Sequence, residues 1–327
     1  MLFHLNQVGV VGALAEADGP RAAADLAEAL SLDERILKTL LEYVCGVDTI
    51  LEQSEDGFAL TAFGRAVIAR YGKETGDGVQ VNLFDVRTGA YGPVWQSLSD
   101  LLTKDATYGE TVHRAGEYAE RGLYTTGKRM APALLDALPS DHTVAVEFGV
   151  HTGLLECVGH ARPDLRLFGV DRNPQALTDC AAMAAREGVE GIGWIEGDIF
   201  RPDTWADRLP GAETGTFYTI HLHEFMGAGR EAVVAWLAAL GRHFPGWRLV
   251  AIEQPRLDAS QRETLPTARW LYSQSNILIH HLIKNGQILY QEAWVEILRD
   301  GGADIESVTP AGYLDYQTFA VRLGGGR

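Results

Sequence analysis

Paired histidines are the side chains of this sequence best suited to chemistry. His221 and His223 lie in the stretch FYTIHLHEF, and His280 and His281 adjoin one another in SQSNILIHHLIKNG. A single imidazole is neutral near pH 7 and can act as a general base on a hydroxyl group. Two imidazoles that face each other, with a carboxylate beside them, can instead hold Fe(II) or Zn(II). For the second pair, a plainer interpretation is one histidine in the core and one partly exposed.

The elements that must position these histidines alternate between strands and helices from about residue 142 onward. The runs HTVAVEFGV, LRLFGVD, IGWIEGDIF, GTFYTIHLHEF and WRLVAIEQP are typical of strands, and helical stretches such as PQALTDCAAMAAREG lie between them. This alternation predicts a mostly parallel sheet covered on both faces. The tail ADIESVTPAGYLDYQTFAVRL predicts two more strands, expected as a hairpin. His221 and His223 would then share one strand face at the carboxyl end of the sheet, where ligands bind.

A glycine-bearing turn follows the first of these strands. Glu147, Gly149 and Gly153 lie in VEFGVHTGLLE. Glycines at such a turn let the backbone approach a ligand closely, and the following helix presents free N–H groups. The pattern is E-x-G-x-x-x-G, which differs from the G-x-G-x-x-G fingerprint of dinucleotide sites. We expect these three residues to contact a cofactor.

Two aspartates complete this candidate binding site. Asp171 ends the second strand, 22 residues after Gly149. A carboxylate at that point can accept hydrogen bonds from both hydroxyls of a ribose. Asp198 follows the third strand in EGDIF and is placed to meet the edge of an adenine, together with Ile199 and Phe200.

The N-terminal segment predicts three helices and a hairpin, the order of a winged helix. The third helix is expected to begin with Ser31 as its N-cap and Glu34 as the partner in a capping box. DNA binding is one interpretation, but this helix carries only Arg35 and Lys38 as cations, against three acidic side chains. A DNA-reading helix needs more positive charge, so a packing or dimerisation module fits better.

Three segments follow from these patterns. We expect a winged-helix-like dimerisation domain at residues 1–75, a helical linker that also walls a substrate pocket at 76–135, and an α/β ligand-binding domain at 136–327. Aromatic side chains in the middle segment are candidates for the pocket wall.

Bulk properties narrow the class of protein. The net charge of −16 repels phosphate backbones and disfavours nucleic acid, whereas a cationic ligand would be tolerated. There is no apolar run of 18 residues and no signal-peptide pattern, so we expect a cytoplasmic protein without a membrane span. Three cysteines, odd in number and not at metal spacing, argue against a disulfide framework.

The turn at 147–153, followed in order by Asp171 and Asp198, resembles class I S-adenosylmethionine (SAM)-dependent methyltransferases. With the N-terminal winged helix, nearly the whole chain is similar to the small-molecule O-methyltransferases of natural-product pathways. The resemblance implies an α/β fold with a Rossmann-like sheet, an N-terminal α-helical winged-helix domain, SAM as cofactor, a small-molecule substrate and a homodimer. In that family a Leu-His-Asp-Trp-like sequence carries the general base. Here LHEF matches it, which assigns that role to His223, and Glu253 falls where the family commonly has an acidic residue.

A departure from this family concerns its later helix. The family has an apolar residue there that forms part of the wall of the substrate pocket, and a glutamate after it orients the catalytic histidine. By alignment the wall position falls at about His280 and the glutamate position on Ile288, so an imidazole enters the wall and the orienting carboxylate is lost.

This departure resembles the metal-dependent 2-oxo acid C-methyltransferases of the phenylpyruvate type, which lead to β-methyl amino acids in antibiotic biosynthesis. The likeness implies Fe(II) or Zn(II) held by His223 with His280, His281 or both, and Glu224 in or next to the site as a catalytic residue. A 2-oxo acid would chelate the metal through its carboxylate and keto oxygens, and the metal would acidify the C3–H.

Other interpretations stay open at this point. A metal-free O-methyltransferase would use His223 as general base, and a non-catalytic winged-helix regulator would use the fold only to bind a small ligand. The substrate's side chain is undetermined, and candidates to bind its carboxylate are Arg114, Arg121 and Arg129.

Overall fold

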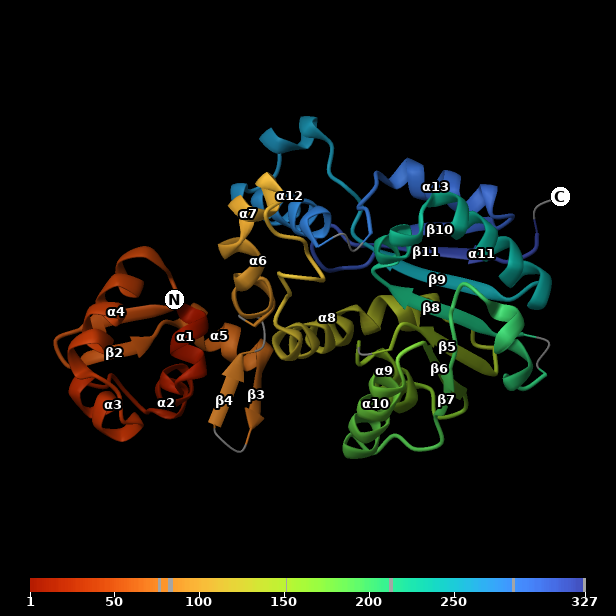
Figure 1. The fold of residues 1–327 in the computed structure, drawn as a ribbon. Coiled ribbons are helices and arrows are strands. Elements are labelled where there is room, and N and C mark those ends of the chain that lie inside the picture. Colours follow the sequence, from red (N-terminus) through yellow and green to blue (C-terminus); the bar gives the residue numbers. More distant parts are fainter. Residues whose placement is uncertain (76–77, 82–84, 151, 212–213, 284–285, 326–327) are drawn as a thin grey trace. The chain divides into compact units, whose positions relative to one another are not determined.

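The computed structural model describes residues 1–75, 78–81, 85–150, 152–211, 214–283 and 286–325 (Figure 1). The chain divides into two compact units. One comprises Met1–Leu98 and His113–Thr125, and the other comprises Ser99–Val112 and Thr126–Arg327. Among the described residues, no helix is both long and apolar enough to cross a membrane.

The first unit has four helices before its hairpin, where three were expected, because Gly9 at φ 82° divides the first helical segment into two; a further helix follows the hairpin. Leu5, Leu26, Leu41 and Phe58 meet in its apolar core, because the helices each bury one apolar face against the hairpin. The hairpin pairs Leu51 with Leu60 in antiparallel register. The elements of this unit are α1 (Leu2–Gln7), α2 (Val10–Glu16), α3 (Ala23–Leu30), α4 (Glu34–Val47), β1 (Leu51–Ser54), β2 (Gly57–Leu60), α5 (Ala62–Tyr71), β3 (Gly72–Thr75), β4 (Gly78–Val81), the π-helical turn η1 (Asp85–Ala90) and α6 (Gly92–Gln96).

The predicted N-cap of α4 is wrong. Asp33 caps this helix, and its side chain accepts the backbone N–H of Ile36 at 2.8 Å. Ser31 instead ends α3 in the left-handed region, at φ 56°. A residue in that conformation cannot also take the extended backbone that an N-cap requires, so the next carboxylate along the chain takes the role.

The second unit contains the seven-stranded sheet, in the order β10-β11-β9-β8-β5-β6-β7. Strands β5 to β9 pair in parallel, whereas β11 runs antiparallel to both β9 and β10. The predicted mostly parallel sheet and C-terminal hairpin are therefore confirmed. The strands are β5 (Val144–Phe148), β6 (Arg166–Asp171), β7 (Gly193–Glu196), β8 (Thr216–Ile220), β9 (Arg248–Glu253), β10 (Asp304–Pro310) and β11 (Gln317–Arg322).

Helices cover the two faces of this sheet (Figure 1). Val146 and Phe148 of β5 join a core with helices α11 and α13, whereas Ala145 faces a second core with α8, α9 and α10. This alternation is the period of two that a strand imposes on its side chains. The helices that follow α6 along the chain are α7 (Leu98–Thr103), α8 (Gly116–Ala137), α9 (Leu154–Ala161), α10 (Pro174–Arg186), α11 (Arg230–His243), α12 (Thr267–Leu282) and α13 (Gln291–Asp300), with the short 3-10 helices η2 (Pro202–Thr204), η3 (Ala206–Arg208), η4 (Leu222–Ala228) and η5 (Ala259–Glu263).

The strand order reverses direction between β5 and β8, which are neighbours in the sheet. The chain leaves β5 through Gly149 and leaves β8 through His221 into η4. In open sheets of this kind, ligands bind at the carboxyl ends of the strands beside such a reversal. The fold therefore brings the predicted glycine turn and the first histidine pair to the same edge.

Candidate active site

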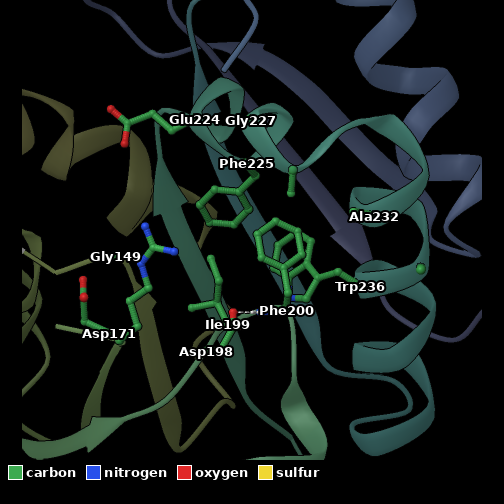
Figure 2. A pocket seen from close by; sticks show the side chains of 13 residues that line it. Gly149, Asp171, Asp198, Ile199, Phe200, Glu224, Phe225, Gly227, Ala232 and Trp236 are labelled. Atoms are coloured by element: carbon green, nitrogen blue, oxygen red, sulfur yellow. Dashed lines mark hydrogen bonds between the residues drawn. The ribbon is translucent and has the colours of Figure 1, made fainter. Parts of the chain in front are cut away.

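A cavity of about 830 Å³ lies at this edge of the sheet. Five of the predicted cofactor contacts line it, together with Glu224 and residues that the sequence analysis did not single out. Figure 2 shows the rings of Phe200, Phe225 and Trp236 grouped on one side and the carboxylates of Asp171 and Glu224 on the other. The lining residues are Gly149, Asp171, Arg172, Asp198, Ile199, Phe200, Glu224, Phe225, Gly227, Ala228, Ala232, Ala235 and Trp236.

The polar end of the cavity is built by two strand ends. Gly149 adopts φ 70°, a left-handed conformation that favours glycine, and its N–H donates to the carbonyl of Val170 at 3.1 Å. This bond ties the turn after β5 to the end of β6. Asp171 follows, and one of its carboxylate oxygens accepts the N–H of Asn173 at 2.8 Å. Its carboxylate is thereby held in place at the cavity wall.

The aromatic end of the cavity begins at the turn after β7. Asp198 accepts the N–H of Phe200 at 3.0 Å, and its carbonyl accepts the indole N–H of Trp205 at 2.9 Å. These bonds fix the Phe200 ring 5.8 Å from that of Phe225 and 5.9 Å from that of Trp236. A flat apolar wall beside carboxylates suits a ligand with an aromatic base and hydroxyl groups.

Glu147 and Gly153 lie elsewhere. Both line a separate, much smaller cavity of about 10 Å³. Glu147 is buried, and the hydroxyl of Thr152 donates to its carboxyl group. Burial, opposed by this hydrogen bond and reinforced by the charge of Glu156, raises the pKa of Glu147 to about 8. Glu147 is thus paired with Thr152 of the turn, and neither Glu147 nor Gly153 lines the large cavity.

The buried carboxyl of Glu147 predicts a distinct pH dependence of stability. Its folded pKa of about 8 exceeds the ordinary value of 4.5, so the folded state retains a proton that the unfolded state releases. Stability should therefore fall as pH rises from about 4.5 to about 8, by up to about 1.4 kcal/mol per pH unit. Glu147→Gln should remove this slope, and should stabilise the protein at pH 8.5 but not at pH 4.5. Chemical denaturation across that range measures it, with the exposed Glu231→Gln as control. If the free energy of unfolding changed with pH in the same way in wild type and Glu147→Gln, the raised pKa of Glu147 would be contradicted.

The first histidine pair does not share a strand face, which corrects the sequence analysis. Strand β8 ends at Ile220, and His221 turns the chain sharply through the left-handed region, at φ 64°. Its N–H still donates to the carbonyl of Ile252 at 3.0 Å, and the chain then enters η4. His223 therefore lies inside a 3-10 helix, where its side chain is fully buried.

A carboxylate from the neighbouring strand holds His223. The two oxygens of Glu253 lie 2.8 and 2.9 Å from Nδ1 of His223, and one of them also accepts the backbone N–H of His223 at 2.7 Å. The N–H of Gln254 completes the arrangement at 2.6 Å. Contact with a carboxylate places the ring proton on Nδ1, which leaves Nε2 with its lone pair.

The electrostatics of His223 reflect this partner. Burial alone lowers its pKa, but the charge and hydrogen bond of Glu253, with a smaller contribution from Glu224, outweigh burial and raise the pKa overall. Nε2 of His223 is buried, and no residue in the described part of the chain forms a hydrogen bond with it. A buried nitrogen in this state is usually satisfied by a ligand, an ion or water.

His280 lies beside His223. The two ring centres are 4.3 Å apart, with the ring planes at 70°. His280 is buried on α12, whereas His281 is exposed. The ring of His221 is 5.3 Å from that of His223, and its Nε2 lies 3.2 Å from the hydroxyl of Tyr316. The structure thus brings His223 and His280 together, with His221 next to them and His281 outside.

A metal ion at this imidazole pair would depend on which side chains around it can act as ligands. The rings of His223 and His280 pack edge to face, with their centres 4.3 Å apart. Within the described ranges, no group of three or more His, Cys, Asp or Glu side chains could hold a metal ion. The described residues thus bring two imidazoles together here, and Nε2 of His223 is a buried donor atom without a hydrogen-bond partner among them.

The sequence analysis noted Glu253 only by resemblance and did not assign it to orient His223. It placed the orienting carboxylate at the position of Ile288, which is a buried apolar residue here, and so inferred that the carboxylate was lost. Glu253 supplies one from the end of β9 instead. An acidic residue that ends an apolar strand next to β8 was the signal available in the sequence.

The predicted arginine contacts are only partly described. Arg129 donates to the hydroxyl of Tyr313 at 2.8 Å, and its guanidinium lies over that ring, 5.3 Å from the centre. Arg114 belongs to the other compact unit, and the side chain of Arg121 lies outside the described residues.

Comparison with known proteins shows the fold of this chain. No protein-family model and no curated protein sequence matches it. Among solved structures, the mitomycin 7-O-methyltransferase MmcR superposes with a TM-score of 0.72 at 19% identity, over 98% of this chain and 93% of that chain. Human N-acetylserotonin methyltransferase in complex with SAM gives 0.73 at 20% identity, over 99% and 93%. The N,N-8-amino-8-demethyl-D-riboflavin dimethyltransferase RosA from Streptomyces davawensis gives 0.66 at 20% identity, over 100% and 94%. The chain therefore has the Rossmann-like α/β fold of these methyltransferases, with a helical N-terminal part.

Proposed function

We propose that this chain is a SAM-dependent methyltransferase that methylates C3 of a 2-oxo acid. The observation that carries the proposal is the buried pair His223–His280, in which Glu253 orients His223 and leaves its Nε2 available. A homodimer and a place in natural-product biosynthesis belong to the same proposal. Three solved structures with this fold support the cofactor, since each is named as a methyltransferase and one contains SAM.

The large cavity would hold SAM, which supplies a methyl group on a sulfonium cation. Asp171 would accept the ribose hydroxyls, and Gly149 would let the backbone approach the methionine part closely. Asp198, Ile199 and Phe200 would bind the adenine. Phe225 and Trp236 extend this apolar wall, although the sequence analysis did not predict them. Glu224 at the opposite side would favour the cationic sulfonium electrostatically.

Asp171 is expected to be the strongest single contact of the cofactor. Asp171→Ala should weaken SAM binding by about 10- to 100-fold, because hydrogen bonds to a charged acceptor contribute about 1.5–3 kcal/mol. Isothermal titration calorimetry with SAM and S-adenosylhomocysteine measures the change. Asp207→Ala is the control, since this aspartate is exposed and does not line the cavity. Equal affinity for the Asp171 variant and the control would place the ribose elsewhere.

The imidazole pair would hold a divalent metal together with the substrate. A 2-oxo acid offers one carboxylate oxygen and one keto oxygen, and these would fill positions that the two histidines leave open. A metal there would polarise the keto group as a Lewis acid and so lower the barrier to moving a proton from C3 to a base, a role for which Glu224 is the candidate. C3 would then take the methyl group of SAM, and S-adenosylhomocysteine would leave. Glu253 would keep His223 in the tautomer that presents Nε2, as carboxylates do for many ligating histidines.

A second candidate function is metal-free O-methylation. The His223–Glu253 pair by itself has the parts of a general base, namely an oriented imidazole with an available Nε2 and a carboxylate that stabilises its protonated form. MmcR, which has this fold, is named as an O-methyltransferase. In this alternative His280 would be only part of the pocket wall.

The position of the transferred methyl group separates the two candidates. Purified protein should be incubated with ¹³C-methyl SAM and either phenylpyruvate or 4-methyl-2-oxopentanoate, with and without EDTA. C-methylation predicts a labelled methyl doublet coupled to the proton at C3, and its loss in EDTA. A label on oxygen, formed equally well in EDTA, would favour the second candidate and overturn the first.

A further inference from the structure

A buried amide pair lies next to the imidazole pair and has no part in the proposed function so far. Gln254 is 1% exposed at the end of β9, and Asn276 is 7% exposed on α12. The side-chain amide of Asn276 donates to Oε1 of Gln254 at 2.9 Å. This hydrogen bond ties the end of β9 to the helix that carries His280.

The position of Gln254 is fixed by its neighbours. Its backbone N–H donates to Glu253, the same carboxylate that holds His223. Pro255 follows it and restricts its backbone to extended conformations. Asn276 precedes His280 by four residues, so the two side chains lie on one face of α12, about one turn apart. Gln254 is therefore linked to both members of the imidazole pair.

The other end of the Gln254 side chain has no partner. Nε2 is buried, and among the described residues none accepts a hydrogen bond from it. A buried donor left in this state costs about 1–3 kcal/mol, so such groups are usually satisfied by a ligand or by water. The second orphaned atom here is Nε2 of His223, which belongs to the residue held by the same carboxylate. Both unsatisfied nitrogens thus belong to residues that are hydrogen-bonded to the carboxylate of Glu253.

The chemistry of these two nitrogens differs. Nε2 of His223 offers a lone pair, whereas the amide of Gln254 offers only N–H donors. A ligand that satisfies both must present a metal-bound or protonated group to the histidine and an acceptor oxygen to the glutamine. A carboxylate has two oxygens, and a chelating 2-oxo acid uses only one of them on a metal.

We propose that the Gln254 side chain binds the substrate's carboxylate, by donating from Nε2 to the oxygen that does not face the imidazole pair. This inference rests on the proposed function and assigns the group that selects acids over neutral ketones. Asn276 positions the amide, because its own donor occupies Oε1 and thereby directs Nε2 to the ligand.

The test measures binding of phenylpyruvate to the holoenzyme in the presence of S-adenosylhomocysteine. Gln254→Met keeps the length of the side chain but removes the donor, and should weaken phenylpyruvate binding by about 10- to 100-fold. Gln254→Glu keeps an acceptor for Asn276 but opposes a carboxylate with a like charge, and should weaken binding at least as much. Binding of S-adenosylhomocysteine should stay within about twofold for both variants, which also verifies that they fold.

Ser273→Ala is the matched control. Ser273 is buried on the same helix, one turn before Asn276, and the proposal gives it no role. Phenylpyruvate should bind this variant as it binds wild type. Wild-type binding with no loss in either Gln254 variant would overturn the inference and leave the proposed function intact. Absence of binding to wild-type protein would overturn both.

Discussion

His280→Ala is expected to reduce kcat/KM for methyl transfer to a 2-oxo acid by about 1,000-fold or more. The variant leaves His223 as the one imidazole ligand, so the ion would be lost together with several kcal/mol of charge stabilisation in the transition state. Bound metal, measured by mass spectrometry on the purified protein, should fall in parallel. SAM affinity should not change, because His280 does not line the large cavity.

His281→Ala is the control for this experiment, since its side chain is exposed on the adjacent position of the same helix. It should retain near wild-type rates and metal content. If His280 is merely part of the pocket wall, its replacement would instead raise KM while kcat is largely retained, and added metal would have no effect on either variant. That outcome would exclude the metal-assisted mechanism.

His223→Ala is expected to lower the rate by about 1,000- to 10,000-fold under either candidate function, because it removes a metal ligand in one and the general base in the other. The exposed His243→Ala is the control for histidine loss. A His223 variant with more than a tenth of wild-type activity would remove this residue from the chemistry altogether.

Glu253→Gln adds a readout that a purely structural role would not produce. Glu253 raises the pKa of His223, and an imidazole must be unprotonated both to bind a metal and to act as a base. Removal of the charge should therefore lower the pKa of His223 and move the acidic limb of the pH–rate profile to lower pH. A shift in the opposite direction would contradict the assigned partnership.

The order of strands and helices could be predicted well because it depends on local patterns. Each of the five parallel strands coincides with a short apolar run, and the glycine turn and Asp171 follow directly from strand ends. The strand–helix alternation then determines which ends share an edge. This is why the large cavity forms where the sequence predicted a cofactor.

The errors at the site have physical causes of two kinds. The left-handed turn at His221 depends on tertiary contacts, so a strand-face argument could not anticipate that His223 enters a 3-10 helix. The role of Glu253 depends on the pairing of β8 with β9, which is not local. The face of β5 on which Glu147 lies, in contrast, could be predicted. Side chains alternate along a strand, so Glu147 shares a face with Ala145 and not with Val146.

Helical periodicity could also have predicted that His280, and not His281, is the buried member of the second histidine pair. Ser273, Asn276 and Ile277 are buried, and His280 continues the same face at helical spacing. His281 falls one position later, outside this face. What the sequence could not give is the distance between this face and η4, which brings the two imidazoles together.

The joint action of His223 and His280 on a 2-oxo acid is tested most directly by hydrogen exchange at C3. Phenylpyruvate should be incubated in D₂O with the protein and S-adenosylhomocysteine, so that no methyl transfer occurs, and followed by proton NMR against a protein-free sample. The proposed chemistry predicts protein-dependent incorporation of deuterium at C3, abolished by EDTA and by His280→Ala. Exchange no faster than in the protein-free sample, with full methyl transfer in EDTA, would contradict it.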